Sequence, residues 1–197
     1  MKMSTYETLL QRIVPFVQPC MQVIVFDALQ QIAVDFFTRT EIWQETLVET
    51  LYHGNTFVEL SPDKGIALSR IRNLLLDGAQ LDGGTDFYVE QAGSGLTIVF
   101  PFTMDTDRTV YAACAVRPAR TATHIPDVFL EDWGDVLVFG TLAKLKSMSG
   151  HNVGWSDPEG AQINLALYEQ GVTQARIRVV RRRDGRRLFV GSQRGIV

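Results

Sequence analysis

Residues 21–51, MQVIVFDALQQIAVDFFTRTEIWQETLVETL, change their hydrophobic period part of the way along, and this change decides the fold class. Up to Arg39 one apolar series steps by 4, 3 and 4 positions, which predicts a helix with one broad buried face. From Trp43 onward bulky and charged residues alternate, as in a half-buried strand. The members of the helical series are Val25, Leu29, Ile32 and Phe36. The chain therefore passes from a helical region into a β region near residue 40.

Turn-forming residues divide the β region into short strands. Runs rich in Gly, Asp, Asn and Pro separate stretches with extended patterns, and connections this short favour antiparallel pairing. The predicted turns lie at residues 53–55, 61–65, 82–84, 93–95 and 105–107. We expect an antiparallel β insertion over residues 41–123.

Helical patterns flank this insertion on both sides. Thr5 to Val14 predicts a short helix that stops at Pro15. Within Phe129 to Met148 the stretch VLVFGTLA, residues 136–143, is apolar on nearly every side, which predicts a helix packed all round, with Gly140 allowing a close approach of another backbone.

The clearest helix start is Asp157-Pro158-Glu159. Aspartate is a favoured N-cap, proline suits the first turn, and a carboxylate there favours the helix dipole. A single apolar stripe follows, which predicts one continuous buried face. Its members are Ala161, Leu165, Tyr168, Val172, Ala175 and Val179. We expect this helix to break at Asp184-Gly185.

Together these patterns predict an α+β fold: a helical bundle with an inserted antiparallel β domain and an extended C-terminal arm. The bundle comprises residues 1–40 and 124–182, the β-rich insertion residues 41–123, and the arm residues 183–197.

The composition is that of an ordinary folded domain. The chain has 197 residues, 46% of them apolar, which is enough for a compact core. No window approaches the roughly 18 apolar residues of a membrane span, and the first residues lack the pattern of a secretion signal. We therefore expect no membrane partner. Cys20 and Cys114 fit buried free thiols better than a disulfide.

The last 22 residues, RIRVVRRRDGRRLFVGSQRGIV, concentrate positive charge. They hold eight of the 19 basic residues and one of the 22 acidic residues, so this segment carries about +7 and the rest of the chain about −10. The net charge of −3 thus conceals an acidic body with a basic end.

No pattern in the sequence indicates catalysis, a cofactor or a metal ion. His53, His124 and His151 have no ligand partners at suitable spacing. Residues 93–95 precede a strand-like run instead of a helix, so they predict a turn and no phosphate loop. We expect the protein not to be an enzyme and to bind no cofactor.

The basic end admits three interpretations: phosphate binding, docking on an acidic protein surface, or a solvated terminus. Apolar residues among the arginines favour an arm that lies in a groove of another subunit, because they are unfavourable in water. The residues of this candidate arm are Arg181, Arg182, Arg183, Arg186, Arg187, Leu188, Phe189, Val190, Arg194, Ile196 and Val197.

The layout also resembles a known family. Residues 5–47, TYETLLQRIVPFVQPCMQVIVFDALQQIAVDFFTRTEIWQETL, give two helices leading to an aromatic-containing strand. Residues 125–150, IPDVFLEDWGDVLVFGTLAKLKSMSG, precede a loop with Trp155 and the DPEG helix start at residues 157–160. This order resembles the head-to-tail adaptor proteins of short-tailed phages, the tail tubular protein A type.

The resemblance implies a structural virion protein at the head–tail interface, assembled in the host cytoplasm. Such adaptors form a ring of twelve that joins the portal to the tail nozzle around the DNA channel. By the same resemblance, Leu188 to Val197 would grip the portal, and the arginines from 181 to 187 would face an acidic portal surface or the passing double-stranded DNA, without sequence specificity. The β insertion would face the next tail component.

A second hypothesis uses the basic end differently. A small DNA-binding regulatory protein would use the arginine-rich C-terminus to neutralise phosphates.

Overall fold

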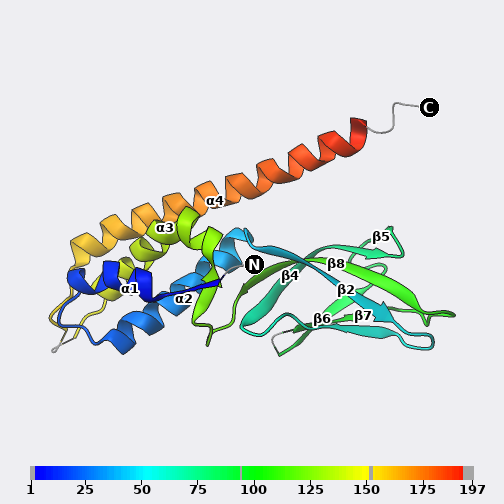
Figure 1. Cartoon of the computed structure of the whole chain (residues 1–197), viewed down its shortest axis with the longest axis horizontal. Coiled ribbons are helices and arrows are strands. Elements are labelled where there is room, and N and C mark those ends of the chain that lie inside the picture. The colour runs from blue at the N-terminus through cyan, green and yellow to red at the C-terminus, as the bar shows by residue number, and fades with distance from the viewer. Residues whose placement is uncertain (1–2, 94, 151–152, 193–197) are drawn as a thin grey trace. The chain divides into compact units, whose positions relative to one another are not determined.

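The computed structural model describes residues 3–93, 95–150 and 153–192 (Figure 1). The chain forms two compact units, and each is described by itself. The helical unit contains the described residues up to Ile42 and from Thr123 onward, and the β unit spans Trp43–Ala122. Four helices with antiparallel sheets inserted between them confirm the predicted α+β class.

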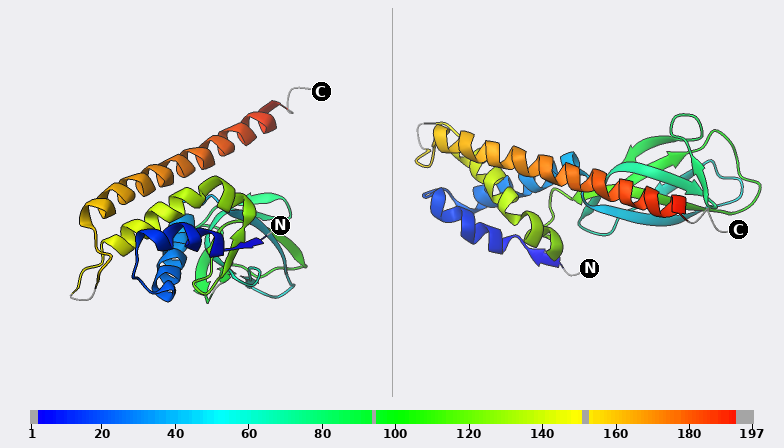
Figure 2. Two further views of the ribbon diagram at one scale, coloured as in Figure 1. Left: turned by 60° about the vertical axis from the view of Figure 1, so that its left-hand side comes forward. Right: turned by 90° about the horizontal axis from the view of Figure 1, so that it is seen from above.

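The helical unit contains four α-helices and one small sheet. Its helices are α1 (Glu7–Ile13), which leads into the 3₁₀ turn η1 (Val14–Phe16), α2 (Gln22–Thr40), α3 (Asp127–Lys146) and α4 (Pro158–Ser192). Strand β1 (Met3–Thr5) pairs antiparallel with β9 (His124–Pro126). This small sheet joins segments about 120 residues apart and was not predicted. Figure 2 shows α4 as one continuous helix lying along α3.

Helix α3 lies at the centre of this unit. It packs against α1, α2 and α4, and most of its side chains between Leu137 and Leu145 are buried. The prediction of a helix covered on nearly all sides is therefore confirmed. Trp133 and Phe129 of α3 contact Phe36 and Phe37 of α2, with ring centroids 5.8 and 5.1 Å apart. These aromatic contacts fix α2 against α3.

Gly140 is a point of close approach, as predicted, but the atoms that approach it belong to side chains and not to another backbone. A Cβ atom at this position would lie 2.7 Å from Cγ2 of Ile32 on α2 and 2.7 Å from Cδ2 of Tyr168 on α4. Both distances are too short for carbon atoms, so α3 can pack this closely between its neighbours only because residue 140 has no side chain.

The β unit contains two antiparallel sheets. The four-stranded sheet has the order β2-β8-β4-β5 and the three-stranded sheet the order β3-β7-β6. The bounds are β2 (Gln44–Leu51), β3 (Phe57–Leu60), β4 (Ile66–Leu76), β5 (Ala79–Leu81), β6 (Tyr88–Ala92), β7 (Gly95–Val99) and β8 (Arg108–Pro118). Alternate residues of β3 and β7 are buried, such as Val58, Leu60 and Ile98. This alternation is the period-two pattern seen in the sequence.

Both cysteines are buried free thiols, as predicted. Burial, with a smaller contribution from the charge of Glu45, raises the pKa of Cys114 to about 11. The thiol of Cys114 therefore stays protonated and unreactive near neutral pH.

Two predictions for the last helix are wrong. First, the helix does not break at Asp184-Gly185 but continues to Ser192, so the described part of the predicted extended arm, residues 183–192, is helical. Glycine inside a helix costs only about 1 kcal/mol, and the arginines and leucine around it are good helix formers. Residues 193–197 lie outside the described part of the chain.

Second, Leu165 belongs to the predicted buried stripe but is 49% exposed. The other five members of that stripe are buried. The helix therefore has the predicted buried face, except at Leu165.

None of the helices in the described ranges has the length and apolar character needed to cross a membrane.

Candidate interaction surface along α4

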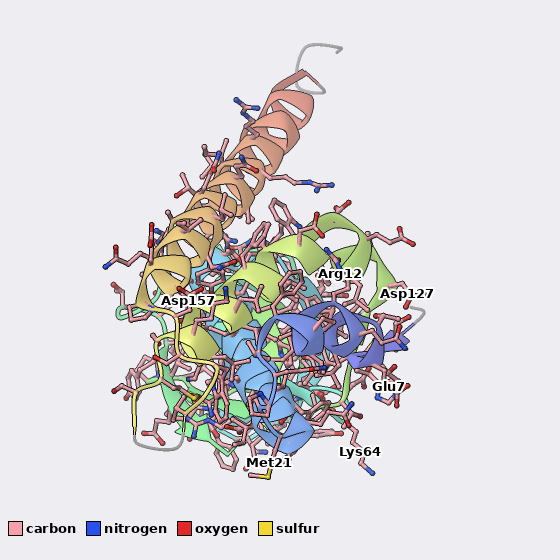
Figure 3. The ribbon with its side chains drawn as sticks, turned by 90° about the vertical axis from the view of Figure 1, so that its left-hand side faces the viewer. Glu7, Arg12, Met21, Lys64, Asp127 and Asp157 are labelled. Carbon is pink, nitrogen blue, oxygen red and sulfur yellow. The ribbon has the colours of Figure 1, made fainter. Side chains whose placement is uncertain are left out.

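The start of α4 is fixed by Asp157. Its Oδ1 accepts a 2.9 Å hydrogen bond from the backbone N–H of Gly160, which is the N-cap interaction that the sequence predicts. Its Oδ2 accepts a 2.9 Å bond from Nζ of Lys146 at the end of α3. The ammonium group of Lys146, followed by the Gly160 N–H, lowers the pKa of Asp157. Figure 3 shows Asp157 where the loop from α3 enters α4.

A second set of contacts joins α4 to α2. The guanidinium of Arg39 donates to both carboxylate oxygens of Glu169, at 2.8 and 2.5 Å. The hydroxyl of Tyr168 donates a 2.7 Å bond to Oδ2 of Asp35, one turn before Arg39. The bidentate pair lowers the pKa of Glu169, while burial raises the pKa of Tyr168, with the nearby Asp35 adding to the effect.

These contacts form one wall of an open groove between α2, α3 and α4, with a volume of about 480 Å³. Leu165 lies in this groove, which explains why it is exposed although it belongs to the apolar stripe. Arg39 and Glu169 are among the residues that line the groove, and its surface is mainly apolar.

Further along, Arg178 joins α4 to α3. Its guanidinium donates a 2.6 Å hydrogen bond to Oδ2 of Asp132 and lies over the ring of Trp133, 5.9 Å from the centroid. Arg12 of α1, labelled in Figure 3, forms an ion pair with Asp135 of α3. Carboxylates near the start of α3 are therefore paired with arginines of its neighbours. Arg178 stabilises the helical unit and is not a free binding residue.

The predicted arm residues fall into three groups. Arg181 is exposed on α4, two positions after the buried Val179. The second group lies in the part of α4 where the structure describes the backbone but not the side chains. Its members are Arg182, Arg183, Arg186, Arg187, Leu188, Phe189 and Val190. Arg194, Ile196 and Val197 lie outside the described residues. The structure therefore places the first eight on one helix and does not test how any of the eleven binds a partner.

The described parts of the chain contain no cluster of three or more His, Cys, Asp or Glu side chains arranged to hold a metal ion. His53 and His124 are exposed and belong to different units, and His151 is outside the described residues.

Sequence reasoning missed the groove and the Arg39–Glu169 pair. Asp35 and Arg39 stand four residues apart on a helix, which is a detectable signal for a charged face. Their partners on α4 are about 130 residues away in sequence, however, and only the packing of α2 against α4 brings them together.

Comparison with protein-family models and with curated proteins gave no match to this chain.

Proposed function

We propose that the chain is a structural virion protein, a head-to-tail adaptor of a short-tailed phage. In this proposal twelve copies form a ring that joins the portal to the tail nozzle around the DNA channel. The C-terminal end of α4, with the residues that follow it, docks on the portal.

The main support for the proposal is the difference between the two ends of α4. The helix is held by ion pairs from Asp157 to Arg178, and it then continues to Ser192 through five arginines. A long helix with a fixed base and a basic end is suited to reach a neighbouring protein that carries an acidic surface.

The test mixes the purified chain with the portal protein of the same phage and examines the product by negative-stain electron microscopy and mass measurement. We expect a collar of twelve copies. Deletion of residues 188–197 should leave a folded protein that no longer binds the portal. A deletion variant that binds with full strength would contradict the assignment of the arm.

A matched pair of variants separates the two classes of arm residue. Replacing Leu188, Phe189 and Val190 with alanine removes apolar anchors, whereas replacing Arg181, Arg182 and Arg183 with alanine removes charge. If apolar docking dominates, the first variant loses portal binding at every salt concentration. The second variant binds more weakly than the parent mainly at low salt, where the attraction between charges is least screened.

The arginine run also favours a second candidate, a DNA-binding regulatory protein. Here the chain alone would bind duplex DNA, with an affinity that falls steeply with salt. Replacing Arg181, Arg182 and Arg183 would reduce the log–log salt slope by roughly 0.9 for each phosphate that the variant no longer neutralises. Tight, salt-dependent binding of the isolated chain to DNA, together with no binding to the portal, would select this candidate over the adaptor.

A further inference from the structure

Helix α4 carries a second stripe on the face opposite to its buried one. Its residues step by 4, 3, 4 and 3, the spacing of a seam between two paired helices. They are Ile163, Leu167, Gln170, Gln174 and Ile177, and we call this set the outer stripe. At 3.6 residues per turn these positions share one side of the helix, and the buried positions 161, 168, 172, 175 and 179 share the other.

The outer stripe is exposed along its length. Ile163 is 57% exposed, Ile177 46% and Leu167 38%, and Gln170 and Gln174 are also exposed. A helix that is apolar on two opposite faces is normally covered on both. Within the helical unit only one of these faces is covered.

The order of residues along the stripe fits a second copy of the same helix running in the opposite direction. When two copies of α4 are placed antiparallel with Gln170 opposite Gln170, residues equally far before and after position 170 face each other. Ile163 then lies opposite Ile177, and Glu159 lies opposite Arg181, while Leu167 faces Thr173 and Gln174 faces Ala166, two exposed residues beside the stripe. Each of these pairs forms twice, because a twofold axis relates the two copies.

Charge favours this antiparallel arrangement over a parallel one. Glu159 lies in the first turn of α4 and Arg181 about six turns later, and both are exposed. A parallel pair would place like charges together at each end, which is unfavourable, whereas the antiparallel pair places opposite charges together. Gln170 on the axis can hydrogen-bond to its own copy, and a polar residue within an apolar seam fixes the register.

We therefore propose that the outer stripe of α4 is a self-association surface, on which two copies of the chain form an antiparallel dimer centred on Gln170. This dimer goes beyond the proposed adaptor function and does not depend on it. The seam from Ile163 to Ile177 is roughly 21 Å long, shorter than the seams of obligate dimers, so the dimer is a reversible one.

The first test reverses charges. Sedimentation or light scattering of the full chain from low micromolar to submillimolar concentration should show a monomer–dimer equilibrium. Glu159→Arg and Arg181→Glu should each weaken the dimer by about tenfold or more. The double variant, which exchanges the two charges, should regain the dissociation constant of the parent. Circular dichroism checks that every variant keeps its helix content.

The second test fixes the register by disulfide formation under mild oxidation. Gln170→Cys should link to its own copy, because the two residues meet on the axis. Gln174→Cys is the matched control on the same stripe: its two copies lie roughly 12 Å apart along the helices, beyond the reach of a disulfide. Cys20 and Cys114 are buried and give little background.

Two results would overturn the proposal. A chain that stays monomeric over the whole concentration range would exclude the dimer, and the outer stripe would then belong to a contact with a different protein. Linkage through Gln174→Cys with none through Gln170→Cys would exclude the proposed register. Neither result bears on portal binding, so the adaptor function is tested separately.

Discussion

The two halves of α4 differ in their contacts with the rest of the helical unit. The first half, residues 158–179, has a capped start, a bidentate ion pair to α2, a paired arginine over Trp133 and a buried apolar face. The second half, residues 180–192, follows the buried Val179 and contains five arginines and one aspartate. The comparison teaches that the contacts holding α4 to α2 and α3 lie before residue 180, whereas most of the arginines expected to dock on the portal lie after it, so each set can be altered alone.

The largest expected effect on stability is at Gly140 of α3, where α3 packs against the first half of α4. Gly140→Ala places a Cβ 2.7 Å from both Ile32 and Tyr168, so α3 must move away from its neighbours. We expect the free energy of unfolding to fall by about 2–3 kcal/mol, measured by urea denaturation. Gly150→Ala is the control, because its Cβ would meet only Val153, at 3.4 Å. Equal effects of the two substitutions would refute close packing at Gly140.

The next largest effect on stability is expected at the start of α4. Asp157→Ala removes both the N-cap bond to Gly160 and the pair with Lys146, whereas Asp157→Asn keeps a capping oxygen and loses only the charge. We expect both variants to lower Tm, the alanine variant by more. The prediction fails if the two variants melt at the same temperature.

A smaller effect is expected from Glu169→Gln. The pair with Arg39 is partly exposed, so its loss should cost about 0.5–1 kcal/mol near neutral pH. The pKa of Glu169 is lowered in the folded chain, so its contribution is present above the unfolded value of about 4.3 and disappears as pH falls through the folded value. Unfolding curves of both proteins between neutral and acid pH should therefore converge on the acid side. A difference that stays constant with pH would contradict this assignment.

The smallest effect on stability is expected in the second half. Replacing Arg181, Arg182 and Arg183 with alanine should change the free energy of unfolding by less than about 0.5 kcal/mol, because Val179 is the last buried side chain among those that the structure describes on α4. The same variant should lose low-salt binding to the portal. A large loss of stability would show that the second half is also part of the folded core.

The two halves also differ in how well they could be predicted from the sequence. The start at Asp157-Pro158 was predictable, because capping depends on residues within one turn of each other. The pairing of Arg39 with Glu169 was not, because it depends on how two distant helices pack. The end of the helix was predicted wrongly at Gly185, because a glycine carries only a modest local cost and the neighbouring residues favour a helix.

The β unit has one property that bears on how such a protein can evolve. Its first and last strands, β2 and β8, are paired, with Gln44 opposite Ala115, and the N–H of Val116 donates a 3.0 Å bond to the carbonyl of Trp43. The chain therefore enters the unit on a strand that pairs with the strand on which it leaves. In evolution, a unit of this kind can be inserted, removed or replaced at a single surface loop. The entropy cost of closing such a loop depends only weakly on the length of the inserted chain. Related chains with the same helices and an entirely different insert would be the expected trace of that history.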